Sequence, residues 1–320
     1  MKVKEKKLLL IKLGSLGDVA MATAILDPLK SYRIFWVLDK NITPLLKRLN
    51  QIDTIIETDH QKMIYGNFFE KIAEVVKIWK QIGFRYFHTI IIAHKDSRYK
   101  LLSLLTFRKS TLFFSKNSLF PLGEFHSKEY LKLLGSNTLP TYPKLTQKKG
   151  RNFIKPVVAF NISSSETKEK NLRNWPIDYF SQLATFIQPY AQVVLIGNGP
   201  QEDLFIKNCL SFVGKTSLDE VIDILCECSC IVTHDSGLLH VARLTMTPIV
   251  ALFGPTNPHH FSSGQSQEIA LHKKIPCSFC YNGKKFPNCK NPICMRLLSP
   301  EEVFKEVLKL LRIDENCNCT

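Results

Sequence analysis

Short apolar runs alternate along the chain with segments in which apolar residues recur at the spacing of a helix. In the first half, the runs predict four strands, and the helical spacing predicts helices between them. The predicted strands are Leu8–Leu13, Arg33–Leu38, Asp53–Glu57 and Phe87–Ala93, and the predicted helices are Val19–Lys30, Leu45–Leu49 and Phe68–Ile82. Because the strand runs are apolar at consecutive positions, both faces of the sheet should be buried, as in a parallel sheet covered by helices.

The second half repeats this alternation after a stretch rich in Pro, Thr, Asn and Lys at residues 136–155, which we interpret as an interdomain linker. Strands are predicted at Val157–Ile162, Gln192–Gly197, Ile231–Asp235 and Pro248–Gly254, and helices from Pro176, after Pro200, and over Ser217–Cys228, Leu238–Leu244 and Pro300–Leu311. A chain of 320 residues is long enough for about two domains. The expected fold is therefore α/β, with doubly wound, Rossmann-like domains at 1–150 and 151–320 that face each other across a cleft.

Three loops beside predicted elements hold the residues best suited to chemistry. They are Gly14-Ser15-Leu16-Gly17-Asp18, Asn171-Leu172-Arg173-Asn174-Trp175-Pro176 and His234-Asp235-Ser236-Gly237. The glycines of the first loop allow a tight turn. The last loop begins a helix whose free backbone amides can bind an anion. Arg173, in the second loop, can make a bidentate contact with a phosphate. Each has a plainer alternative, because Asp18, Asp235 or Ser236 can simply cap a helix and Arg173 can be solvent-exposed.

The motifs of several common enzyme classes are missing from the sequence. It has no Walker A loop, no G-x-G-x-x-G after either opening strand, and no Ser-His-Asp or His-rich metal signature. No run approaches the roughly 20 apolar residues of a membrane span, and Lys12 and Asp18 interrupt an N-terminal stretch that otherwise imitates a signal peptide. We therefore expect a cytosolic protein with most of its ten cysteines as thiols.

The formal net charge of +15 is concentrated in one half of the chain. Residues 1–150 carry 26 Lys and Arg against 12 Asp and Glu, whereas residues 151–320 carry 17 against 16. This asymmetry suggests that the first half meets an anionic surface. The alternatives are a basic face that is merely solvated and a nucleic-acid-binding protein, although the sequence holds no recognisable module of the latter kind.

Taken together, these loops and several further segments resemble glycosyltransferase family 9, the bacterial heptosyltransferases that build the inner core of lipopolysaccharide. The segments are KLGSLGDVAMATAILDPLK, RNWPIDYFSQLA, VVLIGNGPQED, FVGKTSLDEVIDIL, THDSGLLHVARLTMTPIVALFGPTNP, and CSFCY with CMRLLSPEEV. The resemblance implies a GT-B fold with an acceptor-binding domain at 1–150 and a nucleotide-sugar-binding domain at 151–320. It also implies an inverting transfer of heptose from ADP-heptose, without a metal or other cofactor, by a peripheral protein on the cytoplasmic face of the inner membrane.

The same resemblance assigns roles to individual residues. Asp18 matches the catalytic base, beside a glycine loop of Gly14, Ser15 and Gly17. Donor contacts are implied for Arg173, Glu202, Thr216, Asp235, Ser236, Gly237 and His240. The chain departs from the family where His-Pro-Gly-Ala is usual, since it has Phe160-Asn161-Ile162-Ser163-Ser164 there.

The implied partners are a nucleotide-sugar donor, an anionic lipopolysaccharide-type acceptor and an anionic membrane surface, with no nucleic acid. A basic first half and a neutral second half agree with such an acceptor and donor. Two other hypotheses stay open: a transferase of the same fold with another nucleotide sugar or acceptor, and a non-catalytic protein that binds nucleotide sugars.

Four cysteines near the end of the second half, Cys277, Cys280, Cys289 and Cys294, include one C-x-x-C pair. Four thiolates at suitable spacing form tetrahedral zinc sites. Because the second pair is loosely spaced, we expect buried thiols in an ordered loop rather than a metal site.

Overall fold

The computed structural model describes residues 6–114, 124–151, 153, 156–163, 172–198, 206–283 and 285–313. These residues group into two compact units. The N-terminal unit holds the described residues up to Thr146 other than Glu124 and Phe125, and the C-terminal unit holds those two and the residues from Gln147 onward. The last change from one unit to the other, between Thr146 and Gln147, therefore falls inside the segment interpreted as a linker. The function of each unit, and a cleft between them, stay predictions.

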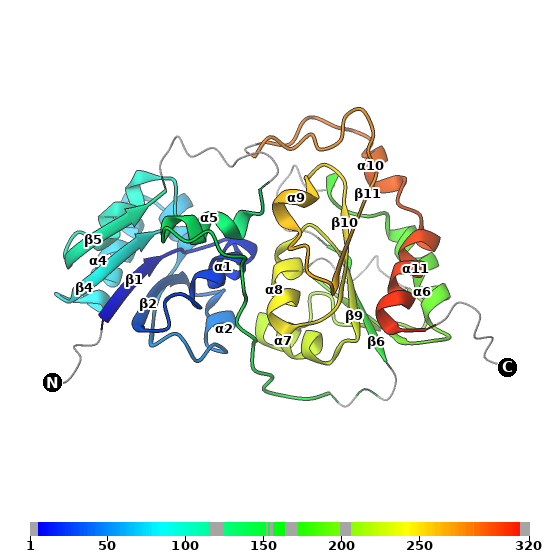
Figure 1. Ribbon diagram of the computed structural model, residues 1–320, viewed down its shortest axis with the longest axis horizontal. Helices are drawn as coiled ribbons and strands as arrows, with labels where there is room; N and C mark the ends of the chain where they lie inside the picture. The colour runs from blue at the N-terminus through cyan, green and yellow to red at the C-terminus, as the bar shows by residue number, and fades with distance from the viewer. Residues whose placement is uncertain are drawn as a thin grey trace. The chain divides into compact units, whose positions relative to one another are not determined.

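The N-terminal unit is built on a parallel sheet with the strand order β3-β2-β1-β4-β5 (Figure 1). Its strands are β1 (Lys6–Ile11), β2 (Tyr32–Asp39), β3 (Thr54–Thr58), β4 (Tyr86–Ile92) and β5 (Phe107–Phe113). Its helices are α1 (Leu16–Ala22), α2 (Thr43–Leu46), α3 (His60–Tyr65), α4 (Phe68–Ile82) and α5 (His126–Leu133), with 3-10 helices η1 (Thr23–Ile25) and η2 (Ser97–Ser103).

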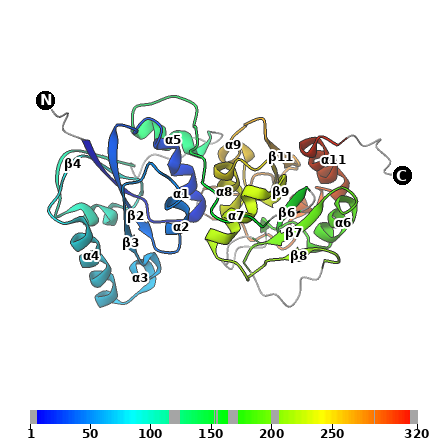
Figure 2. The same cartoon turned by 90° about the horizontal axis from the view of Figure 1, so that it is seen from below.

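Alternate residues of the central strand β1 point to opposite faces of this sheet. Leu9 and Ile11 belong to a core that includes Ile78 and Ile82 of α4. Leu8 and Leu10 are equally buried and point to the other face. Figure 2 shows α1 and α5 on one face of the sheet and α3 and α4 on the other. Burial on both faces explains why the strands are apolar at consecutive positions.

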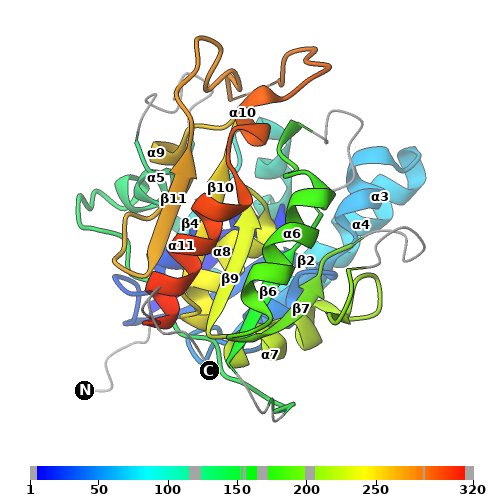
Figure 3. The ribbon, with the colours of Figure 1, turned by 90° about the vertical axis from the view of Figure 1, so that its right-hand side faces the viewer.

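The C-terminal unit has a second parallel sheet, with the order β11-β10-β9-β6-β7-β8. The strands are β6 (Val157–Asn161), β7 (Gln192–Ile196), β8 (Leu210–Ser211), β9 (Cys230–His234), β10 (Ile249–Phe253) and β11 (Glu268–His272). The helices are α6 (Ile177–Ile187), α7 (Leu218–Glu227), α8 (Gly237–Thr245), α9 (Pro258–Phe261), α10 (Ile293–Arg296) and α11 (Pro300–Leu311). Figure 3 shows α6 and α11 side by side on one face of this sheet, with α8 behind it.

Several predicted boundaries differ from the observed ones. The helix predicted over Val19–Lys30 ends at Ala22 and continues as η1 to Ile25. A regular helix could not in any case run through Asp27, because the residue ahead of a proline disfavours helical backbone. Helix α6 begins at Ile177, with Pro176 as its N-cap. The helix predicted after Pro200 falls largely on residues outside the described ranges. By contrast, α4 has the bounds that the spacing predicts.

Each sheet contains a point at which the order of strands reverses. In the N-terminal unit it lies between β1 and β4, and in the C-terminal unit between β6 and β9. The register places Leu10 beside Ile91 in the first pair and Asn161 beside Thr233 in the second. Open α/β sheets bind ligands at the carboxyl ends of the strands at such points. The structure therefore directs attention to the residues that follow these four strands.

Candidate functional site

The carboxyl ends of β1 and β4 bring polar and aromatic side chains together. The backbone N–H of Leu13 donates to Nε2 of His94 over 3.0 Å, so this nitrogen carries no proton. Burial is the main reason why the pKa of His94 falls to about 2. The His94 ring stacks on Tyr99 with 3.8 Å between ring centroids, and the Tyr99 hydroxyl lies 2.8 Å from Nε2 of His60. His94 is thus a neutral acceptor that holds the loop after β1.

Asp18 lies in the first turn of α1 and forms an ion pair with the last residue before the glycine loop. Ser15 is the N-cap of α1, so the interpretation of Asp18 as a simple N-cap is wrong. The Lys12 ammonium is 2.9 Å from Oδ2 of Asp18, and the two side chains are 7% and 36% exposed. Burial raises the pKa of Asp18, but the charges of Lys12 and His126 lower it more, and the net pKa lies below the ordinary value. An ionised, partly accessible carboxylate results.

His126 of α5 lies between two carboxylates. Its Nε2 is 3.8 Å from Oδ1 of Asp18, and its Nδ1 is 3.8 Å from Oε2 of Glu129. The ring also packs edge-on against Tyr130, over which the Lys12 ammonium lies 6.0 Å from the centroid. Helix α5 therefore supplies a second basic group beside Asp18, from more than 100 positions further along the sequence.

The glycine loop is shaped by close packing against α3. A Cβ atom at Gly14 would lie 3.2 Å from Nδ1 of His60, tighter than almost all real contacts. Ser15 precedes α1 without a side-chain capping bond, and Gly17 is buried within the helix. The loop thus places the start of α1, and with it Asp18, next to the end of β1.

In the C-terminal unit, the N-terminus of α8 lies at the switch point between β6 and β9. Ser236 is the N-cap of α8 but makes no side-chain capping bond to the helix. Its hydroxyl instead accepts from Nδ2 of Asn161 over 2.8 Å, while the same amide donates to Thr233 over 2.9 Å. The capping alternative for Ser236 is therefore wrong, and the first amides of α8 are not capped by this side chain. Such amides favour an anion.

Arg173 and Asp235 are brought together from positions 62 residues apart. A guanidinium nitrogen of Arg173 is 3.5 Å from Oδ2 of Asp235, and the two side chains are 20% and 6% exposed. The interpretation of Arg173 as a solvent-exposed arginine is therefore wrong. Burial raises the pKa of Asp235 above its ordinary value, although Arg173 opposes this shift. The guanidinium also lies over the ring of Phe286, 5.4 Å from its centroid.

Several buried polar atoms near this loop have no hydrogen-bond partner among the residues that the structure describes, and three of them bear on a polar ligand. They are Oδ1 of Asn161, Nε of Arg173 and Oδ1 of Asn174. Buried polar groups without a partner are uncommon in folded proteins and need an explanation. A bound polar ligand would supply partners for them.

The other residues expected at the donor site make contacts within the protein. Thr216 donates to the carbonyl of Phe212 over 3.2 Å, just before α7. Nδ1 of His240 is 2.6 Å from the guanidinium of Arg243, and His240 is almost fully buried. Gly237 is the first residue of α8. Their donor contacts stay predictions, and Glu202 lies outside the described residues.

The cysteine segment differs from the expected buried loop. Cys277 and Cys289 are exposed, Cys280 is half-buried, and only Cys294 of the four is buried. The segment around the first three has no helix or strand in its described residues, and Cys277 and Cys289 within it are exposed. Across the described ranges, no group of three or more His, Cys, Asp or Glu side chains is arranged to hold a metal ion. All eight described cysteines are free thiols.

Among the residues that the structure brings to these sites, sequence reasoning missed Lys12, His126 and Asn161, as well as His94 and its partners. Lys12 had a usable signal, because it is a lone charge at the end of a buried apolar run. Asn161 had a similar one, as a polar residue at the end of a strand. His126 had none, since only the packing of α5 places it beside Asp18.

Comparison with known proteins gives one family and several relatives. The family model described as glycosyltransferase family 9 (heptosyltransferase) matches residues 71–289. Lipooligosaccharide heptosyltransferase 2 of Haemophilus influenzae is 29% identical over 146 residues, or 42% of this chain and 41% of that protein. The match thus spans less than half of the length of this relative.

Solved structures share the fold over nearly the whole chain. A glycosyl transferase family 9 structure from Veillonella parvula superposes with a TM-score of 0.76, covering 98% of this chain and 99% of its own, at 21% identity. The ADP-heptose lps heptosyltransferase II of Escherichia coli superposes with a TM-score of 0.72, covering 96% of this chain and 98% of its own, at 17% identity.

In the described residues of this chain, no helix has the length and hydropathy needed to cross a bilayer.

Proposed function

Because the chain belongs to glycosyltransferase family 9 and has its GT-B fold, we propose that it transfers a heptose from ADP-heptose to the inner core of a lipopolysaccharide. The transfer would invert the anomeric carbon and need no metal ion. The observation that supports this most directly is the pair of sites at the switch points. One offers an ionised carboxylate, and the other offers a helix N-terminus whose N-cap side chain makes no capping bond, beside an arginine.

In the N-terminal unit, Asp18 would act as the general base. Inversion needs one carboxylate to take the proton of the acceptor hydroxyl while its oxygen attacks the anomeric carbon. The low pKa of Asp18 keeps it ionised and ready to accept this proton. Lys12, 2.9 Å away, would hold the carboxylate in place, and His126 would face its other oxygen.

In the C-terminal unit, α8 and Arg173 would bind the diphosphate of the donor. Negative charge grows on the leaving ADP as the glycosidic bond breaks, and preorganised amides and cations stabilise such charge. Asp235 would orient Arg173, and Asn161 would hold the Ser236 hydroxyl away from the helix amides. The unpartnered atoms of Asn161, Arg173 and Asn174 would then bind polar groups of the donor.

The charge distribution supports an anionic acceptor for the N-terminal unit. The excess of 26 basic over 12 acidic residues lies in the first 150 positions, as expected for a phosphate-bearing acceptor at a cytoplasmic membrane surface. The almost balanced second half suits a nucleotide, which is bound by a few fixed groups rather than by net charge.

Substitution of Asp18 by asparagine tests the central step. Asp18→Asn should lower turnover by about 100- to 10,000-fold, the usual contribution of a positioned general base, while ADP affinity stays near that of the wild type. Turnover is measured with ADP-heptose and a purified inner-core acceptor, and ADP affinity by titration calorimetry. The matched control is Asp27→Asn, an exposed aspartate paired with Lys30.

Two outcomes would contradict the proposal. Wild-type turnover in Asp18→Asn, or a loss of ADP affinity with unchanged turnover, would remove Asp18 from the role of base. A calorimetric preference for another nucleotide sugar over ADP-heptose would instead leave the fold assignment intact and change the donor.

A further inference from the structure

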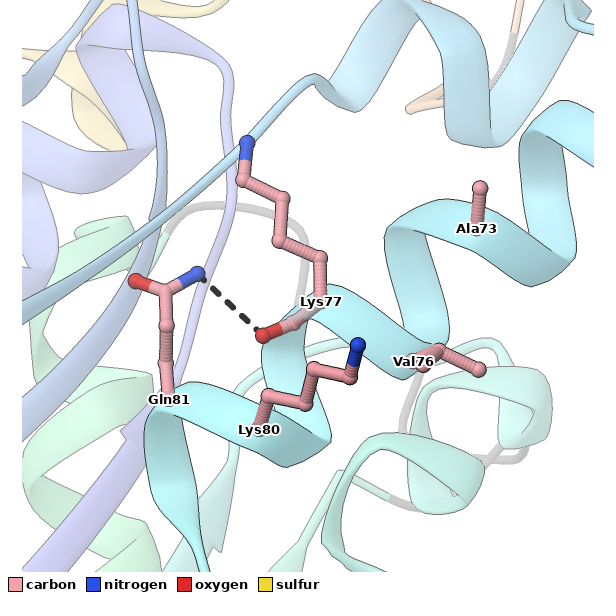
Figure 4. Close-up of a pocket in the computed structure, with 5 residues that line it drawn as sticks. All are labelled: Ala73, Val76, Lys77, Lys80 and Gln81. Carbon is pink, nitrogen blue, oxygen red and sulfur yellow. Dashed lines mark hydrogen bonds between the residues drawn. The ribbon is translucent and has the colours of Figure 1, made fainter.

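Apart from the two sites, the structure has a shallow pocket of about 480 Å³ on the surface of α4 (Figure 4). Its lining residues are Ala73, Val76, Lys77, Lys80 and Gln81. All of them belong to one helix, and the Gln81 amide is engaged with the carbonyls of Glu57 and Lys77. Ligand sites instead gather a few precisely placed polar groups around the ligand. We assign no ligand to this pocket, and the C-terminal unit offers more.

Residues 273–292, which we call the β11–α10 segment, connect β11 to α10 and include three of the four cysteines considered above. They form no helix or strand in their described residues. The segment is attached at the carboxyl end of β10, because the backbone N–H of Tyr281 donates to the carbonyl of Pro255 over 2.9 Å. Strand β10 pairs in parallel with β9, which leads to Asp235 and Ser236. The segment is therefore held at the same edge of the sheet as the site proposed for the donor.

Both ends of the β11–α10 segment are fixed by local contacts. At its start, the Ser278 hydroxyl donates to the carbonyl of Lys273 over 2.8 Å and accepts from the backbone N–H of Ile275 over 3.0 Å. Just past its end, Cys294 is buried, and a Cβ atom at Gly254 would lie 2.9 Å from its Sγ, closer than real Cβ atoms come. The segment can therefore place a side chain precisely although it has no regular secondary structure.

Phe286 of this segment lies against the guanidinium of Arg173. The guanidinium carbon is 5.4 Å from the centroid of the Phe286 ring, which is within the range of a cation–π contact. The Phe286 ring in turn stacks on Tyr281, with 4.5 Å between the centroids and 25° between the planes. Because the backbone of Tyr281 is bonded to Pro255, the stacked Tyr281 ring limits the positions that the Phe286 ring can take.

The two stacked rings do not belong to the hydrophobic core of the C-terminal unit. Ile275 of the same segment packs against that core, whereas in the described part of the chain neither Tyr281 nor Phe286 belongs to it or packs against it. Both rings are half-buried. Core packing therefore does not explain why Phe286 lies where it does, and its contact with Arg173 needs a reason of its own.

Phe286 covers a face of the guanidinium and takes none of its hydrogen-bond donors, because all N–H groups of a guanidinium lie in its plane. One terminal nitrogen of Arg173 is 3.5 Å from Oδ2 of Asp235, and its Nε has no hydrogen-bond partner among the described residues. One contact of this length does not fix the tilt of the plane, whereas a ring against its face does. A bidentate contact with a phosphate requires the plane to point at the ligand.

We propose that Phe286 is a positioning residue: it holds the guanidinium plane of Arg173 so that the free Nε edge faces the phosphates of a nucleoside diphosphate. Arginine suits this arrangement better than lysine, because an ammonium group has no plane to be held. The inference deepens the proposed function, on which it rests for the chemistry of the ligand. It also gives the β11–α10 segment a role at the donor site in place of the metal site considered for its cysteines.

Titration calorimetry with the full-length protein tests this role. Phe286→Leu keeps an apolar side chain but removes the ring, so it should weaken ADP binding by about three- to tenfold, the contribution of a partly desolvated cation–π contact. Adenosine, which has no phosphate, should bind to this variant as to the wild type. Phe286→Tyr keeps the ring and should bind ADP as the wild type does.

A double-mutant cycle and a matched control separate positioning from packing. In the Arg173→Ala background, Phe286→Leu should cause no further loss of ADP affinity, because no guanidinium is left to orient. The control is Phe279→Leu, at a half-buried ring of the same segment that contacts His272 instead of Arg173. This control should bind ADP as the wild type does.

Four results would each overturn the inference: wild-type ADP affinity in Phe286→Leu, an equal loss in Phe279→Leu, an equal loss of adenosine affinity, or an undiminished effect of Phe286→Leu in the Arg173→Ala background. The wild type is also titrated with GDP and UDP. If one of them binds more tightly than ADP, the proposed donor is wrong, and the same variants test Phe286 on that nucleotide. Absence of heptose transfer together with the expected ADP affinities would refute the proposed function and leave the role of Phe286 standing.

Discussion

Substitution of Arg243 by methionine tests how a buried ion pair supports the donor loop. Arg243 is in the last turn of α8, and Glu268 begins β11, with side chains only 1% and 2% exposed. Nε and one terminal nitrogen of the guanidinium each donate to a carboxylate oxygen over 2.8 Å. The other terminal nitrogen lies 2.6 Å from Nδ1 of His240. The pair thus anchors the helix whose N-terminus we propose to bind the donor.

The expected cost follows from these contacts. Arg243→Met removes two charge-assisted hydrogen bonds, each worth about 1.5–3 kcal/mol, and leaves the Glu268 carboxylate buried beside Ser263 without its cation. Removal of one partner of a buried pair typically costs about 3–5 kcal/mol. The free energy of unfolding of the C-terminal unit should therefore fall by about 3–5 kcal/mol. Arg243→Met/Glu268→Met should regain most of this, because no uncompensated charge stays buried.

The free energy of unfolding of the C-terminal unit is measured by urea unfolding, with hydrogen exchange on peptides from β9, α8 and β11 as the readout. The matched control is Lys309→Met, which removes an ion pair whose lysine is 65% exposed and should cost less than about 1 kcal/mol. Burial raises the pKa of Glu268, but hydrogen bonds from Arg243 lower it more, so the folded pKa lies below the ordinary value. The ion pair therefore contributes its full share to the free energy of unfolding above the ordinary glutamate pKa, and this share is lost as the pH falls through the folded pKa. The difference in free energy of unfolding between the wild type and Arg243→Met should accordingly become smaller in acid.

A loss in Arg243→Met of less than about 1 kcal/mol would refute this reasoning, since that is the range of an exposed pair. A double variant as unstable as the single one would also refute it. In that case the cost would arise from lost packing rather than from a stranded charge.

Two further predictions concern the two sites separately. Arg173→Ala should weaken ADP binding by about 1.5–3 kcal/mol in titration calorimetry, whereas Arg296→Ala, at an exposed arginine of α10, should not; equal affinities in the two variants would remove Arg173 from the donor site. Lys12→Met should raise the pKa of Asp18 by removing the adjacent cation, so the acidic limb of the pH–rate profile should move to higher pH while ADP affinity stays unchanged. An unmoved limb would contradict the role of Lys12.

Local patterns in the sequence were sufficient for most of the fold. The apolar spacing of α4 predicted both of its ends, and the continuous apolar runs predicted buried parallel strands. Both predictions succeeded because the spacing of apolar residues indicates which faces of a helix or strand are buried. The pattern failed for β5, since an edge strand with most residues exposed has no apolar run. It also overextended α1, since the helical spacing continues through Asp27, where the following Pro28 disfavours helical backbone.

The sequence by itself determined which loops carry polar residues at strand ends, and so it identified Asp18, Arg173 and the segment Asp235–Gly237. The tertiary structure decided what these residues contact. Asp18 meets His126, Arg173 meets Asp235, and Asn161 meets Ser236, over separations of 108, 62 and 75 positions. A periodic pattern specifies the faces of an element but not its neighbours. The strand order, with β1 beside β4 and β6 beside β9, is set by the packing of the whole sheet, and this order brings the separated side chains together.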